Sequence, residues 1–193
     1  MCETKYEQLI WVDANDREVG SGEKMDTHVK KQLHRAFSIF IWDPQQKKLL
    51  LQKRAFGKYH SGGLWTNTCC SHPRKGQTME QSLRDRLKVE LGLDLPLEIV
   101  SGKQSASVGA VAAQEAGSFC YFADFGLLAE HELDHVYLVE QCAETMTISP
   151  DPEEIAELKW VSLEELDRWM KTKPEEFTAW FSPAWTLARK LLV

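Results

Sequence analysis

Runs of apolar, β-branched and aromatic residues, bounded by turn-forming residues, predict the strands of this chain. The clearest is 36–42, a continuous apolar run typical of a buried strand, which the turn sequence 43–46 joins to 48–54 as a hairpin. The stretch 62–73 is also rich in strand-forming residues, and two glycines at its start allow a tight bend. The remaining predicted strands are 8–12, 119–122, one within 127–139, and 157–161.

Three helices are predicted from capping signals and apolar spacing. A capping-box pattern at Thr78 and a glycine after the last apolar residue delimit a helix over 78–91. A serine followed by two glutamates within three residues begins a second helix, which covers 162–171. Pro174 begins a last helix, which Pro183 is expected to interrupt because proline lacks a backbone N–H.

Two stretches without apolar periodicity are predicted to be loops. Residues 20–34 are polar and carry two histidines and several cations, which is compatible either with a site wall or with a solvated basic loop. Residues 101–118 are rich in Ala, Gly and Ser and are interpreted as an inserted loop. No repeat or linker divides the chain, so 1–193 is predicted to be one domain with a flexible N-terminus over 1–8. Strands that mostly follow one another favour a mixed α/β layer fold.

Composition narrows the class of protein. A chain of 193 residues with 43% hydrophobic residues can bury a sizeable core. The formal net charge of -6 argues against nucleic acid as a partner, which would need a basic face. No apolar run approaches the roughly 18 residues of a membrane span, and the start of the chain lacks an apolar signal region. A cytoplasmic protein without a membrane partner is expected, and its five irregularly spaced cysteines are expected to be reduced.

One candidate site centres on Cys70 and His72. Residues two apart in an extended segment face the same side, so this thiol and this imidazole are predicted to point into one space. Cys69 is predicted to face the opposite way. Taken alone, a Cys-x-His pattern is more often an ordinary buried thiol beside a loop histidine. Residues elsewhere in the chain must therefore decide between the two interpretations.

A carboxylate is predicted on the buried face of the helix over 78–91. Leu83 and Leu87 form its apolar stripe, and Glu90 returns to within about 20° of the same line. Arg86 precedes Glu90 by four residues. The two form either an exposed ion pair worth a few tenths of a kcal/mol or an inward-facing carboxylate that requires a cation. The position of Glu90 beside the apolar stripe favours the inward-facing carboxylate.

Histidines and glutamates in separate segments supply a possible metal site. Glu130 and Glu132 lie two apart at a strand entry and therefore share a face. Together with three histidines they form a nitrogen and oxygen ligand set suited to Zn²⁺, Mn²⁺ or Mg²⁺. The histidines are His28, His34 and His72. Four cations near the same segments favour an anionic group, most simply a phosphate. They are Lys24, Arg54, Lys58 and Arg86.

The chain carries a series of short motifs whose order and spacing resemble those of one enzyme family. They are Glu23-Lys24, His28, Leu33-His34-Arg35-Ala36-Phe37-Ser38, Trp65-Thr66-Asn67, Cys70-Ser71-His72-Pro73, Glu90-Leu91-Gly92, Glu130-His131-Glu132 and Phe177-Thr178-Ala179-Trp180-Phe181. The family is type I isopentenyl diphosphate isomerase, and the resemblance runs from about residue 9 to the C-terminus. It implies a Nudix-like α/β/α sandwich with a mixed β-sheet. It also implies isomerisation of isopentenyl diphosphate to dimethylallyl diphosphate in isoprenoid biosynthesis, through a tertiary carbocation.

The resemblance implies a role for each candidate residue. Cys70 matches the catalytic thiol and Glu132 the opposing acid or base. Tyr121 matches a tyrosine that assists this glutamate, and Trp180 matches an aromatic that faces the cationic centre, with Trp185 as a nearby alternative. Glu90 matches a ligand of Mg²⁺ shared with the substrate diphosphate, which the four cations hold. One Mn²⁺, Zn²⁺ or Mg²⁺ is expected on His28, His34, His72, Glu130 and Glu132.

Other functions are compatible with parts of the pattern. A Nudix diphosphate hydrolase is the main alternative, but that chemistry gathers several glutamates around Mg²⁺, and here the characteristic box retains only Glu90. A zinc-stabilised binding module built on the adjacent cysteines and His72 fits poorly, because structural zinc sites commonly use cysteines in spaced pairs. We therefore expect an isomerase that takes a small-molecule diphosphate as its substrate, and a monomer is favoured.

Overall fold

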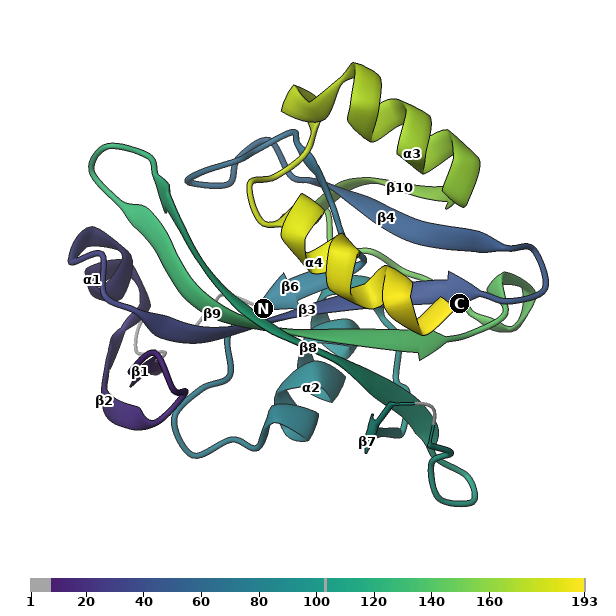
Figure 1. Cartoon of the computed structure of the whole chain (residues 1–193), viewed down its shortest axis with the longest axis horizontal. Coiled ribbons are helices and arrows are strands. Elements are labelled where there is room, and N and C mark those ends of the chain that lie inside the picture. The colour runs from purple at the N-terminus through teal and green to yellow at the C-terminus, as the bar shows by residue number, and fades with distance from the viewer. Residues whose placement is uncertain (1–7, 103, 193) are drawn as a thin grey trace.

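The computed structural model of the chain describes residues 8–102 and 104–192. Strands form its centre and helices lie on the faces (Figure 1). The strands are β1 (Gln8–Val12), β2 (Glu18–Glu23), β3 (His34–Asp43), β4 (Lys48–Arg54), β5 (Trp65–Thr66), β6 (Cys69–Ser71), β7 (Leu97–Ser101), β8 (Val111–Asp124), β9 (Ala129–Glu140) and β10 (Ile155–Ser162). The α-helices are α1 (Lys24–Val29), α2 (Met79–Leu91), α3 (Leu163–Thr172) and α4 (Phe181–Ala188), with 3₁₀ turns at Ala143–Thr145, Pro174–Glu176 and Arg189–Leu192.

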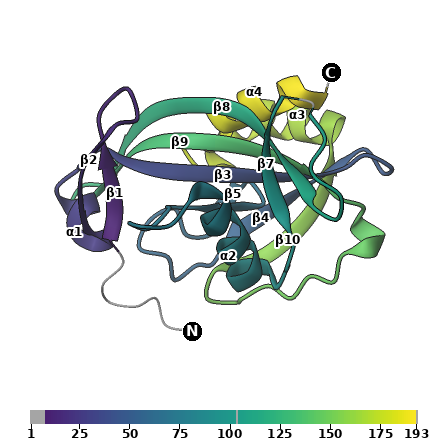
Figure 2. The same ribbon diagram turned by 90° about the horizontal axis from the view of Figure 1, so that it is seen from below.

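The strands form a mixed sheet in the order β10-β4-β3-β9-β8-β7. β3 and β9 run parallel at its centre, whereas β9 and β8 form one long antiparallel hairpin (Figures 1 and 2). β7 is parallel to β8, and β4 is antiparallel to both β3 and β10. The β1–β2 hairpin joins one end of β3 where Trp11 pairs with His34. The parallel centre therefore places residues about a hundred positions apart in the sequence side by side.

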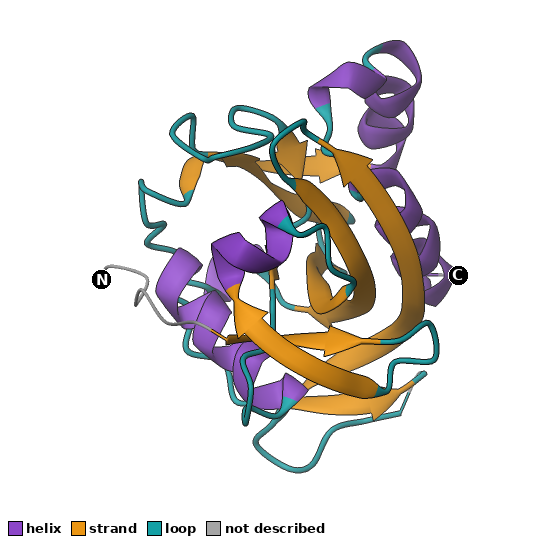
Figure 3. Ribbon diagram, turned by 90° about the vertical axis from the view of Figure 1, so that its left-hand side faces the viewer, coloured by secondary structure: helices purple, strands orange, loops and turns teal. Residues whose placement is uncertain are grey.

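Alternation along the central strands builds a separate core on each face of the sheet. On β3, Phe37 and Ile39 pack in one cluster with Leu87 of α2. The intervening Phe40 packs in the other cluster, where its ring centroid lies 6.0 Å from that of Phe181 of α4. Helix α2 thus covers one face, and α3 and α4 cover the other (Figure 3). This arrangement confirms the predicted α/β/α sandwich with a mixed β-sheet.

β3 and β4 diverge after a short paired region, and this fork creates room for a site. They pair only from Ile41 to Asp43, after which β6 pairs with β3 and β5 pairs with β4. Thr68 lies at the fork, where its Oγ1 accepts a hydrogen bond from Ile41 N at 2.8 Å and donates to Leu50 O at 2.6 Å. The Thr68 side chain therefore connects β3 and β4 at the point where their backbones no longer pair directly.

The predicted loop over 20–34 is wrong in part, because it contains the end of β2 and the whole of α1. This helix has six residues, which is too short to display an apolar period in the sequence. The carboxylate of Glu23 accepts a hydrogen bond from Asp26 N and caps the helix. A local cap, rather than apolar spacing, therefore specifies this element.

The predicted inserted loop over 101–118 is also wrong in part. β8 starts at Val111 and pairs with β9 along most of its 14 residues. Small and polar residues in β8 leave no apolar alternation that sequence reasoning could detect. A bulge next to Gly117, whose φ is 115°, also shifts the register within the strand. Residues 113–118 therefore form a strand because they pair with the apolar strand β9.

The C-terminal segment differs from the prediction at both prolines. Pro174 begins a single 3₁₀ turn, and α4 begins separately at Phe181. Pro183 lies in the first turn of α4 and does not interrupt it, because the first N–H groups of a helix have no intrahelical partner.

The other predicted strands, the hairpin of β3 and β4, and the helix α3 are confirmed. So are the capping box at Thr78 and the end of α2 at the left-handed Gly92. The N-terminus over 1–8, predicted to be flexible, lies outside the described residues except for Gln8. Among the described helices, none has the length and apolar character needed to cross a bilayer.

Candidate active site and metal centre

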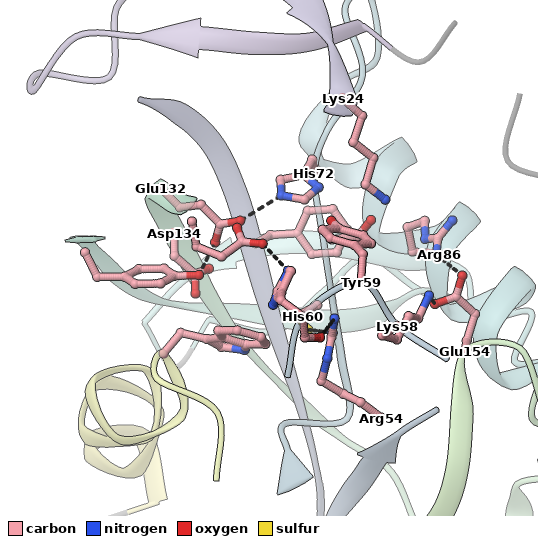
Figure 4. Close-up of a pocket in the computed structure, with 16 residues that line it drawn as sticks. Lys24, Arg54, Lys58, Tyr59, His60, His72, Arg86, Glu132, Asp134 and Glu154 are labelled. Carbon is pink, nitrogen blue, oxygen red and sulfur yellow. Dashed lines mark hydrogen bonds and ion pairs between the residues drawn. The ribbon is translucent and has the colours of Figure 1, made fainter. Parts of the chain in front are cut away.

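A pocket lies at the fork between β3 and β4, and its walls come from segments far apart in the sequence (Figure 4). Histidines and glutamates gather at one end of it, and Lys58, Arg86 and Glu154 lie at the other. Every residue predicted to be catalytic or to hold the substrate lines this pocket. These residues are Lys24, Arg54, Lys58, Cys70, Arg86, Tyr121, Glu132 and Trp180.

The three predicted histidine ligands meet beside one end of the pocket, where His72 is the one that lines the wall. His34 opens β3 and lies opposite Glu132 in the parallel pair with β9. The ring centroids of His28 and His72 lie 4.9 Å and 4.9 Å from that of His34, and 5.4 Å from each other. His72 Nε2 lies 2.7 Å from Glu132 Oε1, and His28 Nδ1 lies 3.8 Å from Glu130 Oε2. All five predicted ligands thus converge.

The donor set fits a divalent cation. One ligand atom each from His28, His34, His72 and Glu130 lies within 4.8 Å of the others. Among the described residues, His34 Nε2 and Glu130 Oε2 are buried without any hydrogen-bond partner, which is costly unless an ion satisfies them. His34 Nδ1 lies 2.8 Å from Gln32 O and His28 Nδ1 lies 3.3 Å from Ala129 O. Those carbonyls orient the rings, as is usual for metal-bound histidines.

Burial keeps the imidazoles of His28 and His72 neutral. It lowers the pKa of His28 to about 2 and that of His72 to about 4. Burial, with the adjacent Glu132, raises the pKa of Glu130 well above its usual range. Burial would also raise the pKa of Glu132, but the neighbouring Glu130, His34 and His72 together hold it well below its usual value. Neutral imidazoles and an ionised carboxylate are the protonation states that bind a metal.

The thiols at positions 69 and 70 point in opposite directions, as the extended segment predicts. Cys70 lines the pocket, with its Sγ 3.9 Å from Arg54 Nη1. Cys69 is fully buried in the core beside α2. Burial raises the pKa of Cys70 to about 12 against the opposing effect of Arg54, so the side chain is a neutral thiol that can donate a proton. The four described cysteines are free thiols.

Tyr121 and Trp180 complete the wall around Glu132. Tyr121 of β8 lies opposite Glu132 of β9 and donates a hydrogen bond from its hydroxyl to Glu132 Oε2 at 2.5 Å. The indole of Trp180 is 4% exposed, and its Nε1 donates to Asn67 Oδ1 at 3.3 Å. Trp185, the alternative aromatic, packs instead against Phe40 in the core beneath α4. The structure therefore places Trp180 at the site and Trp185 away from it.

The opposite end of the pocket is a network of ion pairs. Arg86 donates to Glu90 Oε1 from Nε at 3.0 Å and from Nη2 at 2.8 Å. Its Nη2 also lies 3.4 Å from Glu154 Oε1, and Lys58 pairs with the other oxygen of Glu154. Burial raises the pKa of Glu90, with Arg86 opposing the shift. Glu90 faces inward, as predicted, and Arg86 supplies the cation it requires.

Several pocket residues were not predicted from the sequence. Asp134 follows Glu132 by two positions on the same strand face, so the alternation that identified Glu130 and Glu132 also points to it. Tyr59 and His60 follow Lys58 in a loop, where no periodicity indicates which way a side chain faces. Glu154 lies at the end of an acidic stretch with the composition of a solvated turn. Tertiary structure alone brings these three residues to the site.

Comparison with known proteins identifies the domain. The NUDIX domain family matches residues 32–181. The solved structure of DR0079 from Deinococcus radiodurans superposes with a TM-score of 0.68 at 19% identity, covering 97% of this chain and 100% of that one. A MutT NUDIX hydrolase from Burkholderia pseudomallei gives a TM-score of 0.58 at 18% identity, over 81% of this chain and 98% of that one. The sheet and its two helical layers are therefore those of a NUDIX domain.

Closer relatives in sequence define the particular family. The isopentenyl-diphosphate Delta-isomerase of Photobacterium profundum is 41% identical over 91% of this chain and 90% of its own length. The isopentenyl-diphosphate Delta-isomerase 2 of Photorhabdus laumondii is 42% identical over 91% of this chain and 88% of its own length. The chain belongs to the isopentenyl-diphosphate Delta-isomerase family.

Proposed function

We propose that this protein is an isopentenyl-diphosphate Delta-isomerase, which converts isopentenyl diphosphate to dimethylallyl diphosphate in isoprenoid biosynthesis. The observation that carries the proposal is one pocket with a neutral thiol and a metal-site carboxylate in its walls, an indole beside them, and cations at its far end. The relatives named isopentenyl-diphosphate Delta-isomerase support it independently. The cations in the pocket and the names of the relatives both support a small diphosphate ester as the substrate.

Two proton transfers account for the two groups in the walls. Moving the double bond adds one proton to the terminal alkene carbon, C4, and removes one from C2, so the atoms balance without a redox partner. Cys70 and Glu132 are the acid and base, and both line the pocket. They come from β6 and β9, the two strands that pair with β3 from either side. Tyr121 holds Glu132 in place through its short hydrogen bond.

The indole of Trp180 is suited to a carbocation intermediate. An aromatic face near a cation contributes about 2 kcal/mol or more when water is excluded. Trp180 is fixed by its hydrogen bond to Asn67, and its ring lies 5.3 Å from the Arg54 guanidinium. Because the Trp180 ring already faces the Arg54 cation, it is also placed to face a carbocation on a substrate in the same pocket. Burial of these groups also keeps water from trapping the intermediate.

Two metal ions are part of the proposal. One Mn²⁺, Zn²⁺ or Mg²⁺ would be held by the three histidines with Glu130 and Glu132, and when bound it would tune the proton affinity of Glu132. A Mg²⁺ accompanying the substrate diphosphate would reach Glu90, with Lys24, Arg54, Lys58 and Arg86 binding the diphosphate oxygens. The cytoplasmic location and the monomeric state stay predictions from the sequence.

The geometry of α2 disfavours a Nudix hydrolase. Hydrolysis would need several helix carboxylates gathered around Mg²⁺ at the diphosphate. Here Gln77 donates to Asp85 outside the pocket, and position 86 is an arginine that neutralises Glu90. The helix therefore lines the pocket with Arg86, and its one inward-facing box carboxylate, Glu90, is already paired behind that arginine.

A reaction in D₂O distinguishes the two chemistries. We expect deuterium to enter the C4-derived methyl group of the dimethylallyl product, because acids that exchange with solvent deliver the proton. The diphosphate should stay attached. Release of phosphate or pyrophosphate with an undeuterated hydrocarbon would overturn the functional proposal and leave the fold assignment intact. Mass spectrometry of the products and a phosphate assay on the same mixture measure both outcomes.

The two adjacent thiols provide a matched test of the site. Cys70→Ala should abolish turnover and leave the thermal melting temperature nearly unchanged, because it removes a pocket side chain. Cys69→Ala should retain turnover and lower the melting temperature, because it leaves a cavity in the core. Equal losses of turnover in the two variants would contradict the assignment of Cys70.

A further inference from the structure

A fourth histidine, His60, contacts the metal cluster from the loop between β4 and β5. Its Nε2 pairs with Glu130 Oε1, and its side chain is 3% exposed. Its Nδ1 lies 3.1 Å from Ser61 Oγ, so both ring nitrogens have a partner. In Figure 4 the His60 ring points from its loop toward the side of the pocket where Glu132 and Asp134 lie.

We propose that His60 is a positioning residue of the metal centre, holding one oxygen of Glu130 so that the other faces the three imidazoles. The inference rests on the metal centre of the proposed function. The two oxygens of Glu130 have separate environments: Oε1 is taken by His60, whereas Oε2 lies 3.8 Å from His28 Nδ1 without a hydrogen bond. A carboxylate free to rotate would exchange these oxygens. The contact with His60 selects one orientation before an ion arrives.

The geometry assigns His60 this supporting role rather than that of a ligand. It lies outside the group whose ligand atoms approach within 4.8 Å of one another. Its ring centroid is 6.5 Å from that of His28, whereas His34 is 4.9 Å from His28. Its Nε2, the nitrogen nearest the cluster, is engaged by Glu130. Groups in this outer position orient a ligand and typically change metal affinity 10- to 100-fold when removed.

The ring is fixed by aromatic neighbours from other segments. It stacks on Phe125 in the β8–β9 turn, with centroids 4.8 Å apart and an interplanar angle of 20°. Trp180 approaches its edge at 6.0 Å, and Tyr59 does so at 4.6 Å. Ring stacking and hydrogen bonding are thus separable contributions of one side chain. Replacing His60 by phenylalanine keeps the ring and removes the N–H, while glutamine keeps an N–H donor and removes the ring.

Titration of metal-free protein with Co²⁺, followed through its visible d–d absorption, tests the proposal. His60→Phe should weaken Co²⁺ binding by about 10- to 100-fold and alter the absorption envelope, because Glu130 loses its preset orientation. His60→Gln should restore most of the affinity. His131→Phe is the matched control, since His131 stands between the two glutamates but faces the other side of β9, and it should bind Co²⁺ like the unmodified protein.

The outcomes separate this proposal from the metal centre itself. If the unmodified protein binds no Co²⁺, both the metal centre and the role of His60 are wrong. If it binds Co²⁺ and His60→Phe binds equally tightly with the same spectrum, only the role of His60 is overturned. Equal weakening in His60→Phe and His60→Gln would show that ring packing, and not the hydrogen bond, matters, which also contradicts the proposal. Circular dichroism of each variant confirms that the fold is retained.

Discussion

The two ends of the pocket both contain buried ionisable groups but differ in how completely these groups satisfy one another. At the histidine end, His34 Nε2 and Glu130 Oε2 are buried without a hydrogen-bond partner among the described residues. At the other end, Arg86 binds Glu90 and Glu154, and Lys58 binds Glu154 as well. The first end is electrostatically incomplete, whereas the second is neutralised by the protein alone.

This difference indicates two ways of binding a charged ligand. A buried cluster with unsatisfied polar atoms gains free energy when a cation enters, because those atoms have no hydrogen bonds to give up. A paired network must exchange existing ion pairs for contacts with the ligand, so its net gain is smaller. The histidine end is therefore suited to a resident metal ion, and the arginine end to a substrate group that binds and leaves.

The largest expected effect is the removal of metal from the histidine end. Exhaustive chelation should reduce turnover at least about 1,000-fold and lower the melting temperature. At about 1,000 times the dissociation constant, an ion contributes about 4 kcal/mol to folding stability. Turnover by metal-free protein before and after addition of Mn²⁺, Zn²⁺ or Mg²⁺ measures the effect. Full activity without any divalent ion would show that the histidine end does not depend on a bound metal ion.

Breaking the ion pair at the arginine end should next affect stability. Arg86→Leu leaves the carboxylate of Glu90 buried and unpaired, which should cost about 3 kcal/mol in the free energy of unfolding. The double variant Arg86→Leu, Glu90→Leu should recover most of that loss. Lys88→Leu on the exposed face of α2 is the control and should change stability little, because its ion pair with Asp94 is solvated. Urea unfolding of these three variants and of the unmodified protein measures whether Arg86 and Glu90 form a pair that the protein neutralises by itself.

The wall near Tyr121 and His60 carries Trp180, whose π face is expected to act on the intermediate. Trp180→Leu should lower kcat by about 30-fold, equivalent to about 2 kcal/mol, and Trp180→Phe by less. Trp185→Leu should instead lower the melting temperature with kcat little changed, because Trp185 packs in the core. A greater loss of kcat in Trp185→Leu than in Trp180→Leu would contradict this placement.

The smallest expected effect concerns competition at the arginine end. Glu154→Gln removes a carboxylate that Lys58 and Arg86 now share, so inorganic pyrophosphate should bind a few times more tightly. Glu153→Gln removes the same charge from the neighbouring exposed position and serves as the control. Calorimetric titration with pyrophosphate compares them. Weaker binding in Glu154→Gln alone would mean that Glu154 orients the cations for the diphosphate instead of competing with it.

Sequence patterns alone are enough to locate much of the site. Period-two spacing placed Cys70 and His72 together and turned Cys69 away, and the helical stripe placed Glu90 inward. Spacing worked for these residues because regular backbone fixes the direction of each side chain. It did not identify Tyr59 and His60, whose loop has no repeating geometry. It predicted the strand only over 119–122 and missed the first part of β8, where small and polar residues carry no apolar signal.

The sequence by itself determined the buried strands, the caps of α2 and α3, the faces of the pocket strands and the kinds of ligand available, because these follow from local backbone geometry and residue chemistry. The tertiary structure decided which distant groups meet. The parallel pairing of β3 with β9 sets His34 beside Glu132, the fork of β3 and β4 opens the pocket, and the β8–β9 turn brings Phe125 onto His60. Such contacts depend on the register and packing of many elements at once, which no single stretch of the chain specifies.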